Sequence, residues 1–260
     1  MISNLSHINP NAKIGKNVTV EPFVHIYGNV EIGDNTTIYS NACIMDGARI
    51  GKNCRIFPGA VISGIPQDLK FSGEDTTAEI GDNTTIRECV TVNRGTKDKM
   101  KTVVGSNCLL MAYVHIAHDC LLGNNIILAN SVNLAGHIEI ADNVILEGLV
   151  AVQQFVKIGT YAFITGGSLV RKNVPPFVKA AREPLSFMGI NAIGLRRRGF
   201  SNEQIQQIED IYRTIYVRGL NISNALSIVE METPNSPEKE LILNFIRHST
   251  NGIMRGMSAM

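Results

Sequence analysis

The sequence predicts an all-β domain at residues 1–175, a parallel β-helix built from hexapeptide repeats, followed by a small α-helical domain at residues 176–260. Three observations support this prediction. Aliphatic residues recur at every sixth position, Gly-Asp-Asn and Gly-Lys-Asn triplets lie between them, and the chain has no tryptophan although 44% of it is hydrophobic. Together they indicate a core filled by stacked aliphatic side chains rather than by large aromatic ones.

The six-residue period is nearly complete. Of the 29 positions reached in steps of six from Ile2 to Val170, 26 hold Ile, Leu or Val; the exceptions are Asp68, Glu74 and Asp98. Ile, Leu and Val make up about a quarter of such a chain, so chance would fill only about seven of these positions. Helical solenoid repeats run to about 30 residues or more with a 3.6-residue period, which does not fit strict steps of six. We therefore expect short strands, three to a triangular coil of about 18 residues, and about nine coils.

A second, smaller inward position lies four residues after each aliphatic one. Because small residues fill it, the coil has no room for an indole, which accounts for the missing tryptophan. Cys54, Cys108 and Cys120 occupy this position, so we expect them to fill the core. The triplets suit the corners, because Gly, Asn and Asp tolerate a left-handed backbone. In the first run the small position holds Ala12, Val18, Val24, Val30, Thr36, Ala42, Ala48, Cys54 and Ala60.

Two polar segments interrupt the period, at residues 63–79 and 94–102. We expect them to be loops that leave the coil, and we expect a binding face there because insertions in solenoids usually map to one.

The period ends at Pro175 and Pro176, and the pattern then becomes helical. Ser201 opens one predicted helix with a capping box completed by Gln204. A shorter helix is predicted at residues 224–232, and a third begins at Ser236, with Pro237 at its first position. Such a domain would cover the open strand edges at the end of the β-helix.

Composition excludes several classes of protein. Lys and Arg total 24 against 23 for Asp and Glu, a net charge of +1, which argues against a nucleic-acid binder. Five cysteines without a C-x-x-C pair fit a reducing compartment. The first residues, MISNLSHINP, have neither the basic nor the apolar region of a secretory signal, and no apolar run approaches the length of about 20 residues that a membrane helix needs. We therefore expect a cytoplasmic protein.

The coil length predicts which residues are neighbours, since residues 18 apart stack on adjacent coils about 4.8 Å apart. His118, Gly136 and Gln154 should form one column at a corner, with Asp119 and His137 beside it. The segment HIAHDC also places His115 outside the core.

This column suits acyl transfer. A neutral imidazole such as His118 accepts a proton near pH 7, particularly when a carboxylate such as Asp119 orients it. The backbone N–H of Gly136 could stabilise a developing oxyanion. No serine or cysteine nucleophile lies in the column, so direct transfer is favoured over a covalent acyl-enzyme.

The competing chemistry is metal binding. His115, His118 and His137 could supply three ligands to zinc, as in hexapeptide β-helices that resemble carbonic anhydrases. However, stacked corners of one chain do not preform a tetrahedral set, and Asp119 next to His118 suits an orienting role. We therefore expect neither a metal nor another cofactor.

One triple-basic run, Arg196-Arg197-Arg198, follows the β-helix. Guanidinium groups match phosphates, so this run could hold a diphosphate or a phosphopantetheine carrier. The alternative is a solvated helix end.

Several segments resemble one known family, and the resemblance covers essentially the whole chain. The segments HIAHDC, PQDLKFSGE, RECVTVNRGT, LAGHIEI and GINAIGLRRRGFS and the dipeptide Gln154-Phe155 are similar to the UDP-N-acetylglucosamine O-acyltransferases of lipid A biosynthesis. The resemblance implies a left-handed coil and a homotrimer with active sites between neighbouring β-helices. It also implies transfer of a 3-hydroxyacyl chain from acyl carrier protein to the glucosamine 3-hydroxyl, without a metal, as the first step of lipid A biosynthesis.

The resemblance also implies roles for individual residues. His118 would be the general base, Asp119 its partner and the Gly136 N–H the oxyanion donor. Gly166 would be the position that sets the acyl-chain length, and Gly148, one coil earlier, would extend the acyl-chain groove. Positions that match substrate contacts are Asp68, Lys70, His115, His137, Gln154, Asn191, Arg197 and Arg198.

Three positions depart from the family pattern. Asn93 and Gln153 stand where histidine is common, so neither can be a base, and Ile193 stands where a nucleotide-contacting glutamate is common. The N-acyltransferase of the same pathway is an alternative, but it carries an additional N-terminal uridine-binding domain, for which a first hexad at Ile2 leaves no room. A purely structural β-helix would not need the histidine cluster.

Overall fold

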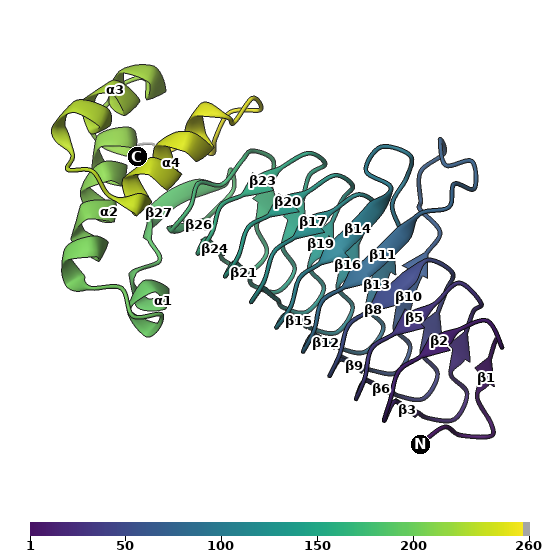
Figure 1. The fold of residues 1–260 in the computed structure, drawn as a ribbon. Coiled ribbons are helices and arrows are strands. Elements are labelled where there is room, and N and C mark those ends of the chain that lie inside the picture. The colour runs from purple at the N-terminus through teal and green to yellow at the C-terminus, as the bar shows by residue number, and fades with distance from the viewer. Residues whose placement is uncertain (257–260) are drawn as a thin grey trace.

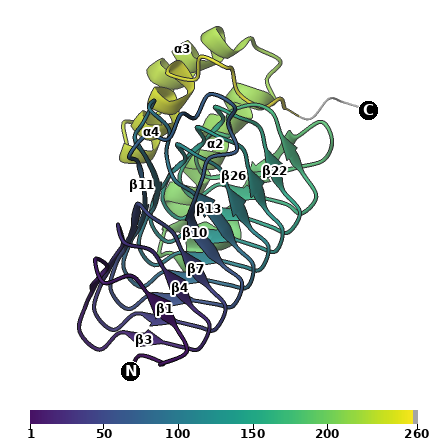
Figure 2. The same ribbon diagram turned by 90° about the vertical axis from the view of Figure 1, so that its right-hand side faces the viewer.

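A computed structural model describes residues 1–256. Figure 1 shows a stack of triangular coils with a group of helices at its C-terminal end. Each side of the triangle is one sheet, whose strands are parallel up to residue 181, and we number the sheets by the order in which the chain first enters them. Figure 2 looks onto the strands of the first sheet.

The first sheet has nine strands. In spatial order they are β1 (His7–Ile8), β4 (His25–Ile26), β7 (Cys43–Ile44), β10 (Val61–Gly64), β13 (Thr91–Asn93), β16 (His115–Ile116), β19 (Asn133–Leu134), β22 (Ala151–Val152) and β25 (Leu169–Val170). The second sheet contains β2 (Lys13–Ile14), β5 (Glu31–Ile32), β8 (Ala48–Ile50), β11 (Thr77–Ile80), β14 (Lys101–Val104), β17 (Leu121–Leu122), β20 (Glu139–Ile140) and β23 (Lys157–Ile158).

The third sheet is the longest because two strands follow the last complete coil. It contains β3 (Thr19–Val20), β6 (Thr37–Ile38), β9 (Arg55–Ile56), β12 (Thr85–Ile86), β15 (Leu109–Leu110), β18 (Ile127–Leu128), β21 (Ile145–Leu146), β24 (Phe163–Ile164), β26 (Val178–Ala181) and β27 (Ser186–Ile190). β26 continues the parallel ladder beside β24, whereas β27 returns antiparallel to β26 and leads into the helices. The sequence-based division at residues 175 and 176 stays a prediction.

The predicted ladder of aliphatic residues forms the core. Ile116 pairs with Leu134 in the next coil, 18 residues on, and both side chains are fully buried. Cys54, Cys108 and Cys120 are buried in the small inward position, as predicted, and burial raises the pKa of the Cys120 thiol to about 12.

In the corner triplets, the asparagine and the glycine have different roles. Asn35 and Asn53 adopt left-handed backbones with φ of 59° and 55°. Gly33 instead permits close stacking, because a Cβ there would lie 2.6 Å from the carbonyl carbon of Gly51 in the next coil. The glycine is therefore needed for space, and asparagine provides the turn.

Both predicted loops leave the coil at the same corner. The first connects β10 to β11 and the second connects β13 to β14, so each lies between the first and second sheets, at corner 1–2. Figure 1 shows them as two blue loops beyond the outline of the coils. The corners between the second and third sheets and between the third and first sheets are called corner 2–3 and corner 3–1 below.

Up to residue 256, the C-terminal region contains four helices: α1 (Ala192–Arg197), α2 (Asn202–Tyr216), α3 (Ile222–Glu232) and α4 (Pro237–Arg247). The predicted starts of α2 and α4 are confirmed, with Ser201 and Gln204 forming the capping box and Ser236 capping α4. Tyr212 is fully buried, and its hydroxyl donates to the Pro176 carbonyl at 2.6 Å, which ties α2 to the end of the coil. None of the helices in residues 1–256 has both the length and the apolar character needed to span a membrane.

Candidate active site

His118, Gly136 and Gln154 stack at corner 1–2, in the coils directly after the two loops. The spacing therefore predicts their neighbourhood correctly. A Cβ on Gly136 would lie 2.7 Å from Cε1 and 2.8 Å from Nε2 of His118, so the imidazole lies against the bare backbone of the glycine. The Gly136 N–H donates no hydrogen bond within residues 1–256.

His118 and Asp119 form a buried dyad. Nδ1 of His118 is 2.8 Å from Oδ2 of Asp119, and the two residues are 6% and 0% exposed. An ionised carboxylate can only accept, so Nδ1 carries the donated proton and Nε2 is left as the acceptor. Nε2 points toward Asp68 of the first loop, whose Oδ2 is 4.0 Å away. The arrangement is that of an oriented general base.

Asp119 also binds the second loop. Its carboxylate accepts from the Thr96 hydroxyl at 2.7 Å, from the Thr96 N–H at 2.9 Å and from the Lys99 N–H at 3.2 Å. Burial by itself would raise the pKa of Asp119, but these bonds and the one from His118 outweigh it and lower the pKa below its usual value. Asp119 is therefore held as a carboxylate, and the second loop is fastened to the dyad.

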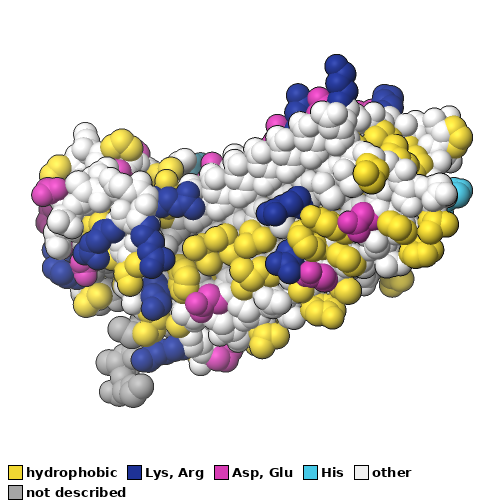
Figure 3. Space-filling model, turned by 90° about the horizontal axis from the view of Figure 1, so that it is seen from below, with side chains coloured by type: hydrophobic (Ala, Val, Ile, Leu, Met, Phe, Trp, Pro, Cys, Tyr) yellow, Lys and Arg dark blue, Asp and Glu magenta, His cyan; other side chains and the backbone are white. Residues whose placement is uncertain are grey.

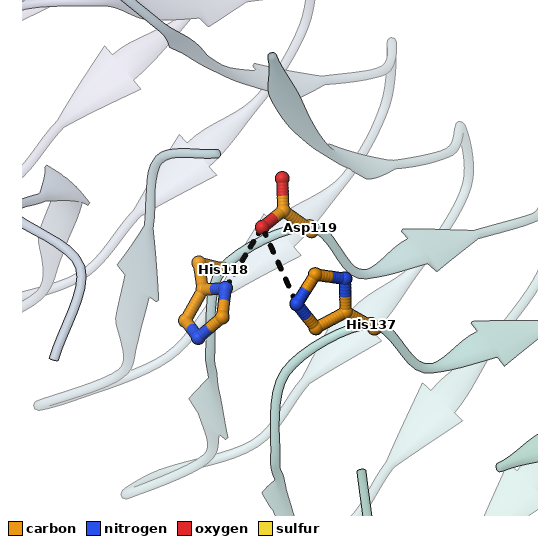
Figure 4. Close-up of side chains that lie close together, drawn as sticks. All are labelled: His118, Asp119 and His137. Atoms are coloured by element: carbon orange, nitrogen blue, oxygen red, sulfur yellow. Dashed lines mark hydrogen bonds and ion pairs between the residues drawn. The ribbon is translucent and has the colours of Figure 1, made fainter. Parts of the chain in front are cut away.

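His137 lies on the other side of the Asp119 carboxylate, as Figure 4 shows. Its ring stacks on Phe155 at a centroid distance of 4.7 Å and meets the His118 ring edge-on at 5.0 Å. Its Nε2 is 3.8 Å from Oδ2 of Asp119, and its buried Nδ1 is 3.0 Å from Oδ2 of Asp98 without hydrogen-bond geometry. The Phe155 contact was not predicted from the sequence, although the dipeptide Gln154-Phe155 was noted.

A pocket of about 400 Å³ opens beside this cluster, between the two loops and the column. It is lined by Asp68, Lys70, Glu74, Thr96, Lys97, Asp98, His137, Gln154 and Phe155. Four of the predicted substrate-contacting residues thus share one pocket. A larger groove of about 940 Å³ between α2 and α3 has no histidine in its lining, so it lacks a comparable base.

His115 lies apart from this pocket. It is on the outer side of β16, where its Nδ1 is 2.7 Å from the Thr91 hydroxyl, and burial lowers its pKa. The metal alternative named His115, His118 and His137, but the cluster whose ligand atoms lie within 4.8 Å is His118, Asp119 and His137. Four hydrogen bonds already occupy the Asp119 carboxylate, so this donor set fits a metal poorly.

The other predicted residues lie at other corners of the chain. Asn191 caps α1: its Oδ1 accepts from the Gly194 N–H at 3.2 Å, and its Nδ2 donates to the Tyr161 carbonyl at 3.0 Å. Arg198 donates to Oδ1 of Asn143 at 2.6 Å. Because Asn143 and Tyr161 lie at corner 2–3, the basic run is at a different corner from His118. Arg196, Arg197 and Ile193 are also exposed.

The glycines predicted for the acyl-chain groove lie at corner 3–1. A Cβ on Gly166 would lie 3.1 Å from the carbonyl oxygen of Gly148, so the two form one continuous backbone surface. The Gly166 N–H donates to Glu147 at 3.0 Å. Of the positions that depart from the family pattern, Asn93 is buried and donates to the Ile65 carbonyl at 3.3 Å, whereas Gln153 is exposed.

Comparisons with known proteins identify related chains. A family model described as UDP-N-acetylglucosamine O-acyltransferase, domain 2, matches residues 173–254, and a model of bacterial transferase hexapeptides (six repeats) matches residues 11–46, 29–64 and 101–136. The acyl-[acyl-carrier-protein]–UDP-N-acetylglucosamine O-acyltransferase of Paracidovorax citrulli is 49% identical over 259 residues, which are 98% of this chain and 99% of that protein. The homologue of the same name from Chlorobaculum parvum is 52% identical over 195 residues, 75% of this chain and 74% of that protein.

Solved structures extend the likeness to the fold. The crystal structure of the UDP-N-acetylglucosamine acyltransferase from Bacteroides fragilis is 57% identical, with a TM-score of 0.97 over 98% of this chain and all of that chain. That of LpxA from Acinetobacter baumannii is 40% identical, with a TM-score of 0.95 over 98% of this chain and 99% of that one. The β-helix is of the left-handed hexapeptide type. The chain therefore belongs to the family of acyl-[acyl-carrier-protein]–UDP-N-acetylglucosamine O-acyltransferases.

Proposed function

We propose that this protein transfers a 3-hydroxyacyl chain from acyl carrier protein to the glucosamine 3-hydroxyl of UDP-N-acetylglucosamine, the first step of lipid A biosynthesis. The observation that carries the proposal is the His118–Asp119 dyad beneath the free backbone N–H of Gly136. Family membership supports the same reaction.

The dyad and Gly136 carry out different parts of the reaction. Nε2 of His118 takes the proton of the sugar 3-hydroxyl while that oxygen attacks the thioester carbonyl carbon. The oxyanion that forms accepts a hydrogen bond from the Gly136 N–H, a donor fixed by the coil. The intermediate then expels the carrier's thiolate, which takes the proton back from His118. The base is regenerated, and no covalent enzyme intermediate forms.

The pocket beside the dyad suits the acceptor sugar. Asp68, Lys70, His137 and Gln154 place donors and acceptors around it, as hydroxyl-rich substrates require. We assign the diphosphate to Arg197 and Arg198, because guanidinium groups pair well with phosphate oxygens. Gly148 and Gly166 are assigned to the acyl chain.

We infer a homotrimer, because these groups lie at three different corners of one chain and a second copy is needed to bring them together. The outer side of the second sheet is charged, with pairs such as Lys99–Glu139 at 3.0 Å and Lys157–Glu139 at 2.9 Å. Figure 3 views the underside of the molecule in Figure 1, where a band of apolar side chains runs along the coils. Half-buried outward residues of the third sheet are Leu109, Ile127, Ile145 and Phe163.

A cyclic arrangement follows from these faces. If the third sheet of one copy packs on the first sheet of the next, three triangular prisms close a ring. The second sheet of each copy then faces water. Corner 1–2 of one copy then meets corner 2–3 of its neighbour, so His118 and Arg198 face one site from two chains. His115, on the first sheet, would face the same boundary. We also propose a cytoplasmic location, which the five free cysteines fit.

The test is His118→Ala, assayed with a panel of acyl-carrier-protein thioesters of different chain length and with 3-hydroxyl and 3-amino acceptor sugars. We expect kcat to fall at least about 100-fold, the usual contribution of a general base, with native circular dichroism. His7→Ala, an exposed histidine far along the coil, is the matched control. A native rate in His118→Ala would overturn the mechanism, and one tightly held zinc per subunit in the purified protein would overturn the metal-free reaction.

A further inference from the structure

Thr96 of the second loop has a place in the dyad that the proposed mechanism does not yet use. It is 7% exposed, its hydroxyl donates to Oδ2 of Asp119 at 2.7 Å, and its N–H donates to Oδ1 at 2.9 Å. The same Oδ2 accepts from Nδ1 of His118 at 2.8 Å. A continuous hydrogen-bonded chain therefore runs from the Thr96 hydroxyl through the carboxylate to the imidazole.

This double contact fixes the plane of the carboxylate. One donor on each oxygen prevents rotation about the Asp119 side-chain torsion, and the Lys99 N–H reinforces the contact to Oδ1 at 3.2 Å. Without the hydroxyl, Oδ2 would keep only His118 as a hydrogen-bond partner among residues 1–256. A base must be held within a few tenths of an ångström of its working position to act at full rate.

The loop that carries Thr96 also forms a wall of the acceptor pocket, because the next residues, Lys97 and Asp98, line it. Two ionisable side chains near the dyad are Asp68 from the first loop and His137 from the next coil. One short segment thus contacts both the predicted sugar pocket and the orienter of the base.

We propose that Thr96 is a positioning residue for acyl transfer: its hydroxyl holds Asp119 in the orientation that aligns His118, and it couples the seating of the second loop to the activity of the base. The inference rests on the proposed function. Its effect should appear in kcat rather than in KM, because Thr96 acts through Asp119 and leaves the rest of the pocket wall in place.

The experiment compares Thr96→Val, which removes the hydroxyl but keeps the shape and the N–H, with Thr96→Ser, which keeps the hydroxyl. Thr76→Val is the matched control: Thr76 is 1% exposed, and its hydroxyl donates to the Gly95 carbonyl at the base of the same loop at 2.6 Å, not to Asp119. We expect kcat to fall about tenfold in Thr96→Val with little change in KM, and to recover in Thr96→Ser. Thr76→Val should keep the native kcat.

A double-mutant cycle shows whether Thr96 acts through Asp119. In an Asp119→Ala background, Thr96→Val should lower kcat no further, since the group it orients is gone. A native kcat in Thr96→Val, an equal loss in Thr76→Val, or a full additional loss in the Asp119→Ala background would each overturn the proposal. If Thr96→Val folds poorly, Thr96→Ala removes the same hydroxyl with less bulk.

These outcomes separate the inference from the proposed function. If His118→Ala is inactive while Thr96→Val is fully active, only the role of Thr96 is wrong. If His118→Ala keeps the native rate, the mechanism itself fails, whatever Thr96→Val shows.

Discussion

Two corners of the same coil differ in what they do with their backbone donors. At corner 2–3, the Asn124 N–H is capped by Oδ1 of Asp142 in the next coil at 2.6 Å. The same cap recurs along that corner, at Lys16 with Asp34 and at Lys52 with Asp82, both at 2.7 Å. At corner 1–2, the equivalent Gly136 N–H has no cap within residues 1–256, because Gln154 in the next coil is exposed and does not bond to it.

These two corners show how a structural repeat becomes a reactive site. A capped N–H group is chemically silent, since it already has a partner. The residue that follows His118 in the column is glycine, which allows the imidazole to approach the backbone, and Gln154 one coil further leaves the glycine N–H uncapped. The site thus arises from an omitted cap as much as from an added histidine.

Gly136→Ala should have the largest effect on corner 1–2. Its Cβ would lie 2.7 Å from the His118 ring, so the ring must move away from the donor. We expect kcat to fall at least about 100-fold, because the displaced base no longer lies beside the donor, while circular dichroism stays native. A variant with native kcat would mean that the close contact between His118 and the bare backbone of Gly136 does not matter.

Asp119→Asn tests the buried charge at the same corner. The loss of charge-assisted hydrogen bonds should destabilise the protein by about 2 kcal/mol at pH 7. The pKa of Asp119 is lowered in the fold, so its stabilising effect is present above the unfolded value of about 3.9 and is lost as the pH falls through the lower folded value. The gap in unfolding free energy between wild type and Asp119→Asn should therefore shrink below about pH 4. A gap that stays constant from pH 7 to pH 3 would contradict this assignment.

Asp142→Ala removes a cap at corner 2–3 and should have the smallest effect. We expect a loss of about 1 kcal/mol of stability from the bond to the Asn124 N–H, seen as a Tm lower by about 2–4 °C. The kcat should not change, because corner 2–3 supplies no base in this coil. A large loss of activity with a native Tm would remove the distinction between the two corners.

The periodic part of the molecule was predictable because the coil converts sequence spacing into position. Ile116 and Leu134 stack because they are 18 residues apart, and the same rule places Gly136 on His118. The starts of α2 and α4 were predictable from their capping residues, Ser201 and Ser236.

The contacts of non-periodic segments were not predictable in this way. The loop that brings Thr96 to Asp119 has no repeat from which its path could be read, and the same holds for the six-residue helix α1, capped by Asn191. The stack of Phe155 on His137 depends on side-chain orientations, which spacing does not determine. Spacing also could not show that Arg198 lies at another corner from His118, because Arg198 lies beyond the repeat.

The two loops at corner 1–2 differ in how freely their length and sequence can change. The coil register pairs Val61 with Thr91 and Thr91 with His115, whatever length of chain lies between them. Insertions there therefore leave the column undisturbed. The second loop is fastened to the dyad by hydrogen bonds, whereas Asp68 of the first loop lies 4.0 Å from His118. The first loop can therefore vary, in evolution or in the design of an enzyme for a new acceptor sugar. The second loop is constrained by the base that it supports.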